Sequence, residues 1–65
     1  MKLETLLKVI DDAADIAIVN HTTLDIEYMG PRELLSLGAF VKYRTWNVEK
    51  IFNGTPGDIV IEISK

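Results

Sequence analysis

The 65-residue chain contains no cysteine and only one histidine. The absence of cysteine excludes disulfides and thiolate metal sites, and one histidine cannot form a histidine-based zinc site within one chain. A domain this small buries only about 60% of the surface that its unfolded chain exposes, so such domains often depend on a disulfide, a metal or a partner subunit. We therefore expect a homo-oligomer, most simply a dimer, with no cofactor and no bound metal.

Basic residues and long apolar runs are also scarce. Seven Lys and Arg against ten Asp and Glu give a net charge of −3, which is not the basic footprint of a nucleic-acid-binding or membrane-surface protein. Charges interrupt the first residues, and no apolar run approaches the roughly 20 residues of a membrane span. We expect a cytoplasmic protein without membrane contact, and nucleic acid is disfavoured as a partner.

What the chain has is enough apolar residues for a core. It is 48% hydrophobic and 26% charged, as expected for one globular domain over residues 1–65. Residues 2–12 are predicted to be a helix, ending where Asp11 and Asp12 oppose the helix dipole. Its apolar stripe has the spacing i, i+3, i+4 and i+7 and consists of Leu3, Leu6, Leu7 and Ile10.

Residues 15–20 are the centre of the predicted fold, because they are apolar on both faces of a strand. Alternation places Ile16 and Ile18 on one face, and Ala17 and Val19 on the other. A second strand is predicted over residues 24–29. An odd-length loop would place its Leu24 and Ile26 beside Ile16 and Ile18 under the helix, and an even-length loop would place them on the other face. We expect the odd-length loop.

The middle of the chain has weaker patterns. A short helix is predicted from Pro31 to residue 37, ended by Gly38 and held to the core edge by Leu34, Leu35 and Leu37.

The last part of the chain is predicted to form a second hairpin. Val48, Ile51 and Phe52 are assigned to the core, and their spacing indicates a bulge near residues 49–50. A turn over residues 53–57 then leads into a strand over residues 58–64.

The predicted class is therefore α+β: a four-stranded antiparallel sheet made of two hairpins, with the N-terminal helix on one face and a short helix between the hairpins. Nothing in the chain is left to cover the other face, where we expect Ala17, Val19, Val60 and Met29 to be exposed.

No group of residues indicates catalysis. The carboxylates Asp11, Asp12 and Asp15 lack a calcium-binding loop, and are read as a solvated helix end. His21 lies in a predicted turn without a nucleophile or oxyanion-hole motif. We therefore expect no enzyme.

Cations and aromatic residues alternate in residues 42–46, where Lys42 and Arg44 flank Tyr43 and Trp46 follows. This pattern suits stacking on single-stranded bases, a protein interface, or a Trp46 in the core with the cations folded over it. All three interpretations stay open. The candidate interface residues are Tyr43, Arg44, Trp46, Met29, Val19 and Val60.

Five segments share a common pattern of apolar spacing: residues 5–12, 15–18, 31–35, 48–51 and 59–63. They form a leucine-rich first helix, an x-I-x-I strand, a small L-L helix and a final V-x-x-I…I-x-I strand pair. Together they resemble short uncharacterised proteins of phages, prophages and mobile elements in Gram-positive bacteria, which share these features. The resemblance implies no activity and no site residues.

The leading hypothesis is a non-enzymatic interaction module that self-associates through its sheet. The alternatives are an acidic inhibitor or decoy of a host nucleic-acid-handling enzyme, and a single-stranded nucleic-acid binder acting through residues 42–46.

Overall fold

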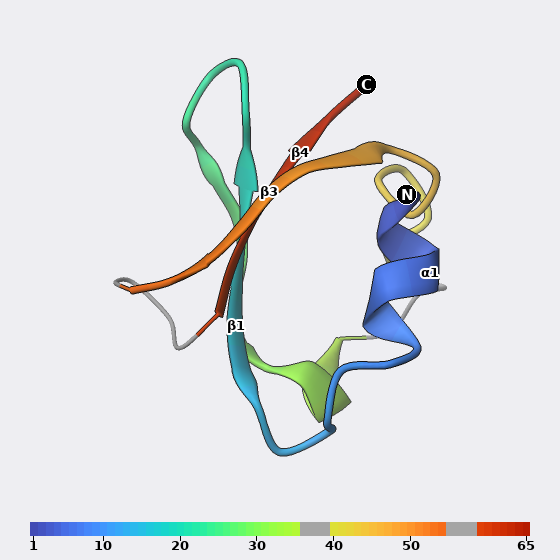
Figure 1. Ribbon diagram of the computed structural model, residues 1–65, viewed down its shortest axis with the longest axis vertical. Coiled ribbons are helices and arrows are strands. Elements are labelled where there is room, and N and C mark those ends of the chain that lie inside the picture. Colours follow the sequence, from blue (N-terminus) through green and yellow to red (C-terminus); the bar gives the residue numbers. More distant parts are fainter. Residues whose placement is uncertain (36–39, 55–58) are drawn as a thin grey trace.

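The computed structural model describes residues 1–35, 40–54 and 59–65. One short helix lies against one face of a four-stranded sheet, which makes a small α+β unit (Figure 1). The strands lie side by side in the order β2-β1-β4-β3. The elements in chain order are α1 (Leu3–Leu7), β1 (Asp15–Asn20), β2 (Ile26–Pro31), the 3-10 turn η1 (Arg32–Leu34), β3 (Asn47–Asn53) and β4 (Ile59–Ser64).

The sheet is mixed. Both predicted strand pairs are present, since β1 pairs with β2 and β3 with β4 in antiparallel fashion. The two central strands, β1 and β4, are parallel, so the prediction of a purely antiparallel sheet was wrong. β1 is apolar on both faces, whereas β4 has Glu62 and Ser64 on the face away from the helix. The apolar pattern placed β1 in the centre of the sheet, but it does not encode the direction of the strands beside it.

The helix is much shorter than the predicted span of residues 2–12. α1 comprises Leu3–Leu7, after which the chain turns. The Asp11 carboxylate accepts a hydrogen bond from the Ala13 amide at 2.8 Å. Such local side-chain bonds compete with helix, and the β-branched pair Val9 and Ile10 also disfavours it. The predicted apolar face is nevertheless confirmed, because Leu3, Leu6 and Leu7 are all buried.

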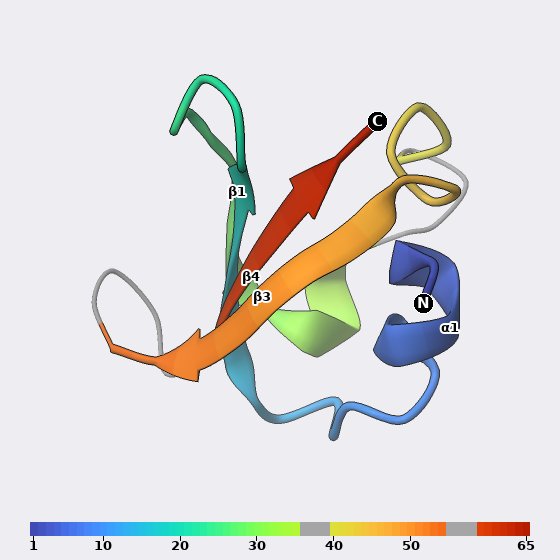
Figure 2. The ribbon, with the colours of Figure 1, turned by 45° about the horizontal axis from the view of Figure 1, so that its top comes forward.

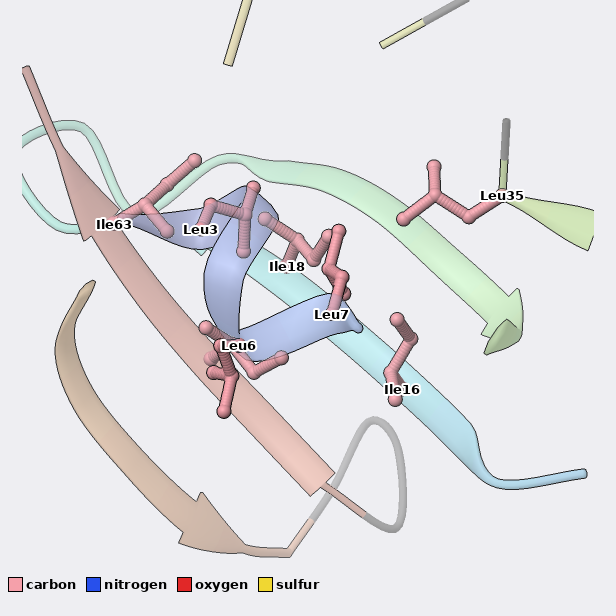
Figure 3. Packing of buried hydrophobic residues seen from close by; sticks show 8 residues of the cluster. Leu3, Leu6, Leu7, Ile16, Ile18, Leu35 and Ile63 are labelled. Carbon is pink, nitrogen blue, oxygen red and sulfur yellow. The ribbon is translucent and has the colours of Figure 1, made fainter. Parts of the chain in front are cut away.

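The main core lies between α1 and the sheet. Figure 3 shows the leucines of the helix above the isoleucines of β1 and β4, with Leu35 at one side. The buried members of this cluster are Leu3, Leu6, Leu7, Ile16, Ile18, Leu35, Ile61 and Ile63. This arrangement confirms the predicted face of Ile16 and Ile18.

The first hairpin differs from the prediction in register. β2 begins at Ile26, two residues later than predicted, and Leu24 lies in the connecting loop with φ 65°. A register shift between Ile18 and Val19 pairs Ile26 with Val19 and Tyr28 with Ile18. The loop, residues 21–25, is odd in length as expected. The expectation that Leu24 and Ile26 lie under the helix was wrong, because the bulge places Tyr28 there instead.

Gly30 lies near the end of β2 and has a backbone conformation that other residues rarely adopt. Its φ is +151°, and a Cβ at this position would lie 3.1 Å from the Tyr28 hydroxyl oxygen. That hydroxyl donates a hydrogen bond to the Pro31 carbonyl at 2.6 Å, so the Tyr28 ring cannot move away from a new Cβ without weakening this hydrogen bond.

We expect Gly30→Ala to lower the free energy of unfolding by about 1–3 kcal/mol, from backbone strain and this contact. Gly54→Ala is the matched control, because Gly54 has a similar φ of +155° but nothing within 4 Å of a built Cβ. Thermal unfolding of both variants checks the prediction, and equal losses would contradict the role of Tyr28.

The structure does not show the helix that was predicted between the hairpins. The described part of that segment forms only the single turn η1, after which Leu35 is extended and buried. Leu34 is exposed, contrary to the prediction that it holds this segment to the core. Ser36 and Leu37 of the predicted helix, and Gly38 that was expected to end it, lie outside the described residues.

The second hairpin follows the prediction more closely. A register shift between Val48 and Lys50 confirms the expected bulge, and β4 has the expected alternation. Most of the predicted turn over residues 53–57 lies outside the described residues. Ile51 and Phe52 were assigned to the core, yet they are 51% and 42% exposed. The reason is that β3 is an edge strand.

Candidate functional site

The structure divides the predicted interface residues between two places. Tyr43, Arg44 and Trp46 lie in the segment before β3, near α1, whereas Val19, Val60 and Met29 lie on the uncovered face of the sheet. The six residues therefore do not form one patch.

The aromatic segment packs against the main core. Tyr43 and Trp46 are partly buried, with their ring centroids 4.7 Å apart in a T-shaped arrangement. Phe40 continues the series, 4.9 Å from Tyr43. Lys42 lies over the Tyr43 ring, with Nζ 5.1 Å from its centroid. This placement agrees with the interpretation in which Trp46 belongs to the core, but Lys42 lies over Tyr43 and not over Trp46 as that interpretation expected.

The same segment supports the start of α1. The Leu3 amide donates to the Trp46 carbonyl at 2.9 Å, and the Glu4 amide donates to the Arg44 carbonyl at 2.8 Å. These bonds satisfy amides that the first turn of a helix leaves without partners. The Arg44 guanidinium also lies 3.6 Å from the Glu4 carboxylate. Position and hydrogen bonding thus give these residues a structural role.

The uncovered face of the sheet has a buried centre. Ala17, Val19 and Val60 are 0%, 9% and 2% exposed, although the sequence predicted that they would be exposed. Each is small and lies on a central strand, and its cross-strand partner on β2 or β3 is larger: Met29, Ile26 and Phe52 respectively. Larger side chains on both edges therefore shield the small ones between them.

The exposed apolar residues of the sheet all lie on its two edge strands. Ile26 and Met29 on β2 are 50% and 56% exposed, and Ile51 and Phe52 on β3 have similar exposure. We call these four residues the sheet-edge residues. Of them, the sequence predicted exposure only for Met29, because strand alternation does not reveal which strands are central and which are at an edge.

β3 and β4 also carry polar side chains on the face of the sheet away from the helix. Glu62 is the cross-strand partner of Lys50, and its carboxylate lies 2.8 Å from Nδ1 of His21. The Ser64 hydroxyl donates to the Glu49 carboxylate. His21, which the sequence placed in a turn, is thus connected to the sheet through Glu62.

Within the described ranges, no group of three or more His, Cys, Asp and Glu residues is placed to hold a metal ion. None of the helices in the described part is long and apolar enough to cross a membrane.

No family model, curated protein or solved structure was found to match this chain.

Proposed function

We propose that this protein is a non-enzymatic interaction module that associates with a second copy of itself through its sheet. The observation that carries the proposal is the exposure of the sheet-edge residues: four large apolar side chains at about half exposure, all on the two edge strands. Ile51 and Phe52 are adjacent in β3, and an exposed apolar edge strand offers unpaired backbone groups to another chain.

The size of the chain supports a second copy as the partner. Such a short chain without disulfides gains disproportionately from a subunit that buries more apolar surface. An interface made by so small a sheet belongs to the weak, transient class, so we expect micromolar association.

The alternative nucleic-acid-binding function has less support. A stacking platform for bases needs accessible aromatic rings, whereas Tyr43 and Trp46 are partly buried against the core. The acidic-decoy alternative, the cytoplasmic location and the phage-like origin remain predictions from the sequence.

Sedimentation equilibrium of the full chain tests the proposal. We expect the average mass to rise towards twice the monomer mass between micromolar and millimolar concentration. Phe52→Lys should weaken this association at least about tenfold, because a charge would replace desolvated apolar surface. Val9→Lys is the control, since Val9 is 78% exposed but lies outside the sheet. A constant monomer mass over the whole range would refute the proposal.

A further inference from the structure

The outer edge of β3 is only partly covered. Figure 2 shows β3 as the nearest strand of the sheet, with one end beside α1 and the other extending away from it. The N-terminus pairs with the first end: Lys2 forms an antiparallel bridge to Asn47, and the Val48 amide donates to the Met1 carbonyl at 2.8 Å. Of the described residues, no others pair with this edge. Residues 49–53 therefore present their outer backbone groups without a strand partner in that part of the chain.

The uncovered segment is apolar on both sides. Ile51 pairs with Ile61 and faces the helix-covered side, whereas Phe52 pairs with Val60 and faces the uncovered side. Packing of a second sheet onto one face would cover Phe52 but leave Ile51 exposed. A strand added at the edge contacts side chains on both faces, because its own side chains also alternate.

We infer that the uncovered part of β3 is where two copies join, in antiparallel fashion, to make one continuous eight-stranded sheet. This inference rests on the proposed self-association and names the strand responsible for it. The N-terminus of each copy occupies the edge up to Val48, which restricts the pairing to residues 49–53 of both copies. Complete overlap of this segment with itself places its middle residue, Ile51, on the twofold axis opposite Ile51 of the second copy.

This register also matches the flanking residues. Lys50 lies opposite Phe52 of the second copy, and both side chains are on the uncovered face, since Lys50 pairs with Glu62 and Phe52 with Val60. An ammonium group beside an aromatic ring is a favourable pair. Shifting the register by two residues in one direction would instead oppose Lys50 to itself, and like charges in direct opposition destabilise a strand pair.

The opposite edge of the sheet is less suited to pairing. β2 ends in Gly30 and Pro31, and its register with β1 is interrupted by a bulge. Proline lacks the amide donor of a strand ladder, and a bulge twists an edge away from regular pairing.

A charge-swap experiment at Ile51 tests the inference. Ile51→Lys and Ile51→Glu each place two like charges opposite one another at the twofold axis, so each variant alone should associate at least about tenfold more weakly than the unaltered chain. An equimolar mixture should recover association as a heterodimer, because opposite charges then meet. Met29→Lys mixed with Met29→Glu is the matched control and should show no such recovery. Circular dichroism confirms that each variant is folded, as expected for a half-exposed position.

The outcomes separate the two proposals. If the unaltered chain is monomeric at every concentration, the proposed function fails and the inference fails with it. If the unaltered chain dimerises and both Ile51 variants alone still dimerise, the proposed function stands and the edge pairing is refuted. If both Ile51 variants are monomeric alone and their equimolar mixture also stays monomeric, the pairing centred on Ile51 is refuted.

Discussion

Leu7→Ala should lower the free energy of unfolding by about 2–5 kcal/mol, which is the usual cost of removing a buried leucine side chain and leaving a cavity. Leu7 is 1% exposed and packs with Ile16, Ile18 and Leu35 in the main core. A domain of this length has a total stability of only about 3–10 kcal/mol, so the variant should be largely or wholly unfolded at moderate temperature.

Val9→Ala provides the control for this prediction. Val9 lies on the turn after α1 and is 78% exposed, so its truncation should change stability by less than about 0.5 kcal/mol. Denaturant titration followed by far-ultraviolet circular dichroism measures both variants. Similar losses for the two would show that α1 does not pack on the sheet as described.

Arg32→Met should lower the free energy of unfolding by about 1–3 kcal/mol, the usual cost of losing charged hydrogen bonds to partly buried carbonyls. Arg32 Nε donates to the Leu7 carbonyl at 2.9 Å, and Arg32 Nη1 donates to the Leu35 carbonyl at 3.2 Å. One side chain thereby joins the end of α1 to the chain that leaves η1. Methionine keeps the apolar volume and removes both donors.

Arg32→Lys distinguishes geometry from charge in this contact. A lysine keeps the positive charge, but its single ammonium group lacks the planar fork that reaches two carbonyls. We expect the lysine variant to recover less than half of the loss, measured by the same denaturant titration. Full recovery would mean that charge alone, and not the paired donation, holds these two segments together.

The apolar pattern was sufficient to predict the most apolar elements. β1 was predicted over its observed range, β4 differs only at Asp58, which lies outside the described residues, and the burial of Leu3, Leu6 and Leu7 was correct. The helix and β4 have periods of about 3.6 and 2 residues, and β1 is a short continuous apolar run. The length of α1 was wrong because Asp11 forms a local turn that competes with the helix.

The parts that failed depend on contacts between distant segments. Nothing in the sequence of β1 or β4 indicates that the two strands run parallel. Ile51 and Phe52 have the composition of core residues, and only the position of β3 at the end of the sheet makes them exposed. Arg32 was not identified because its two acceptors are backbone carbonyls, which leave no trace in side-chain patterns.

The candidate site was predicted in part. Met29 was expected to be exposed and is, whereas Val19 and Val60 are shielded by larger neighbours on the edge strands. The structure therefore moves the candidate surface from the centre of the uncovered face to the edges of the sheet, and above all to β3.

The most direct test of the account is an isotope-filtered NMR experiment on an equal mixture of labelled and unlabelled chain at millimolar concentration. Cross-strand side chains directly opposite one another have Cβ atoms about 5 Å apart, well within the range of such a measurement. We expect cross-copy signals between the Ile51 methyl groups, and between Lys50 and Phe52. Cross-copy signals confined to Ile26 and Met29, or none at all, would contradict the account.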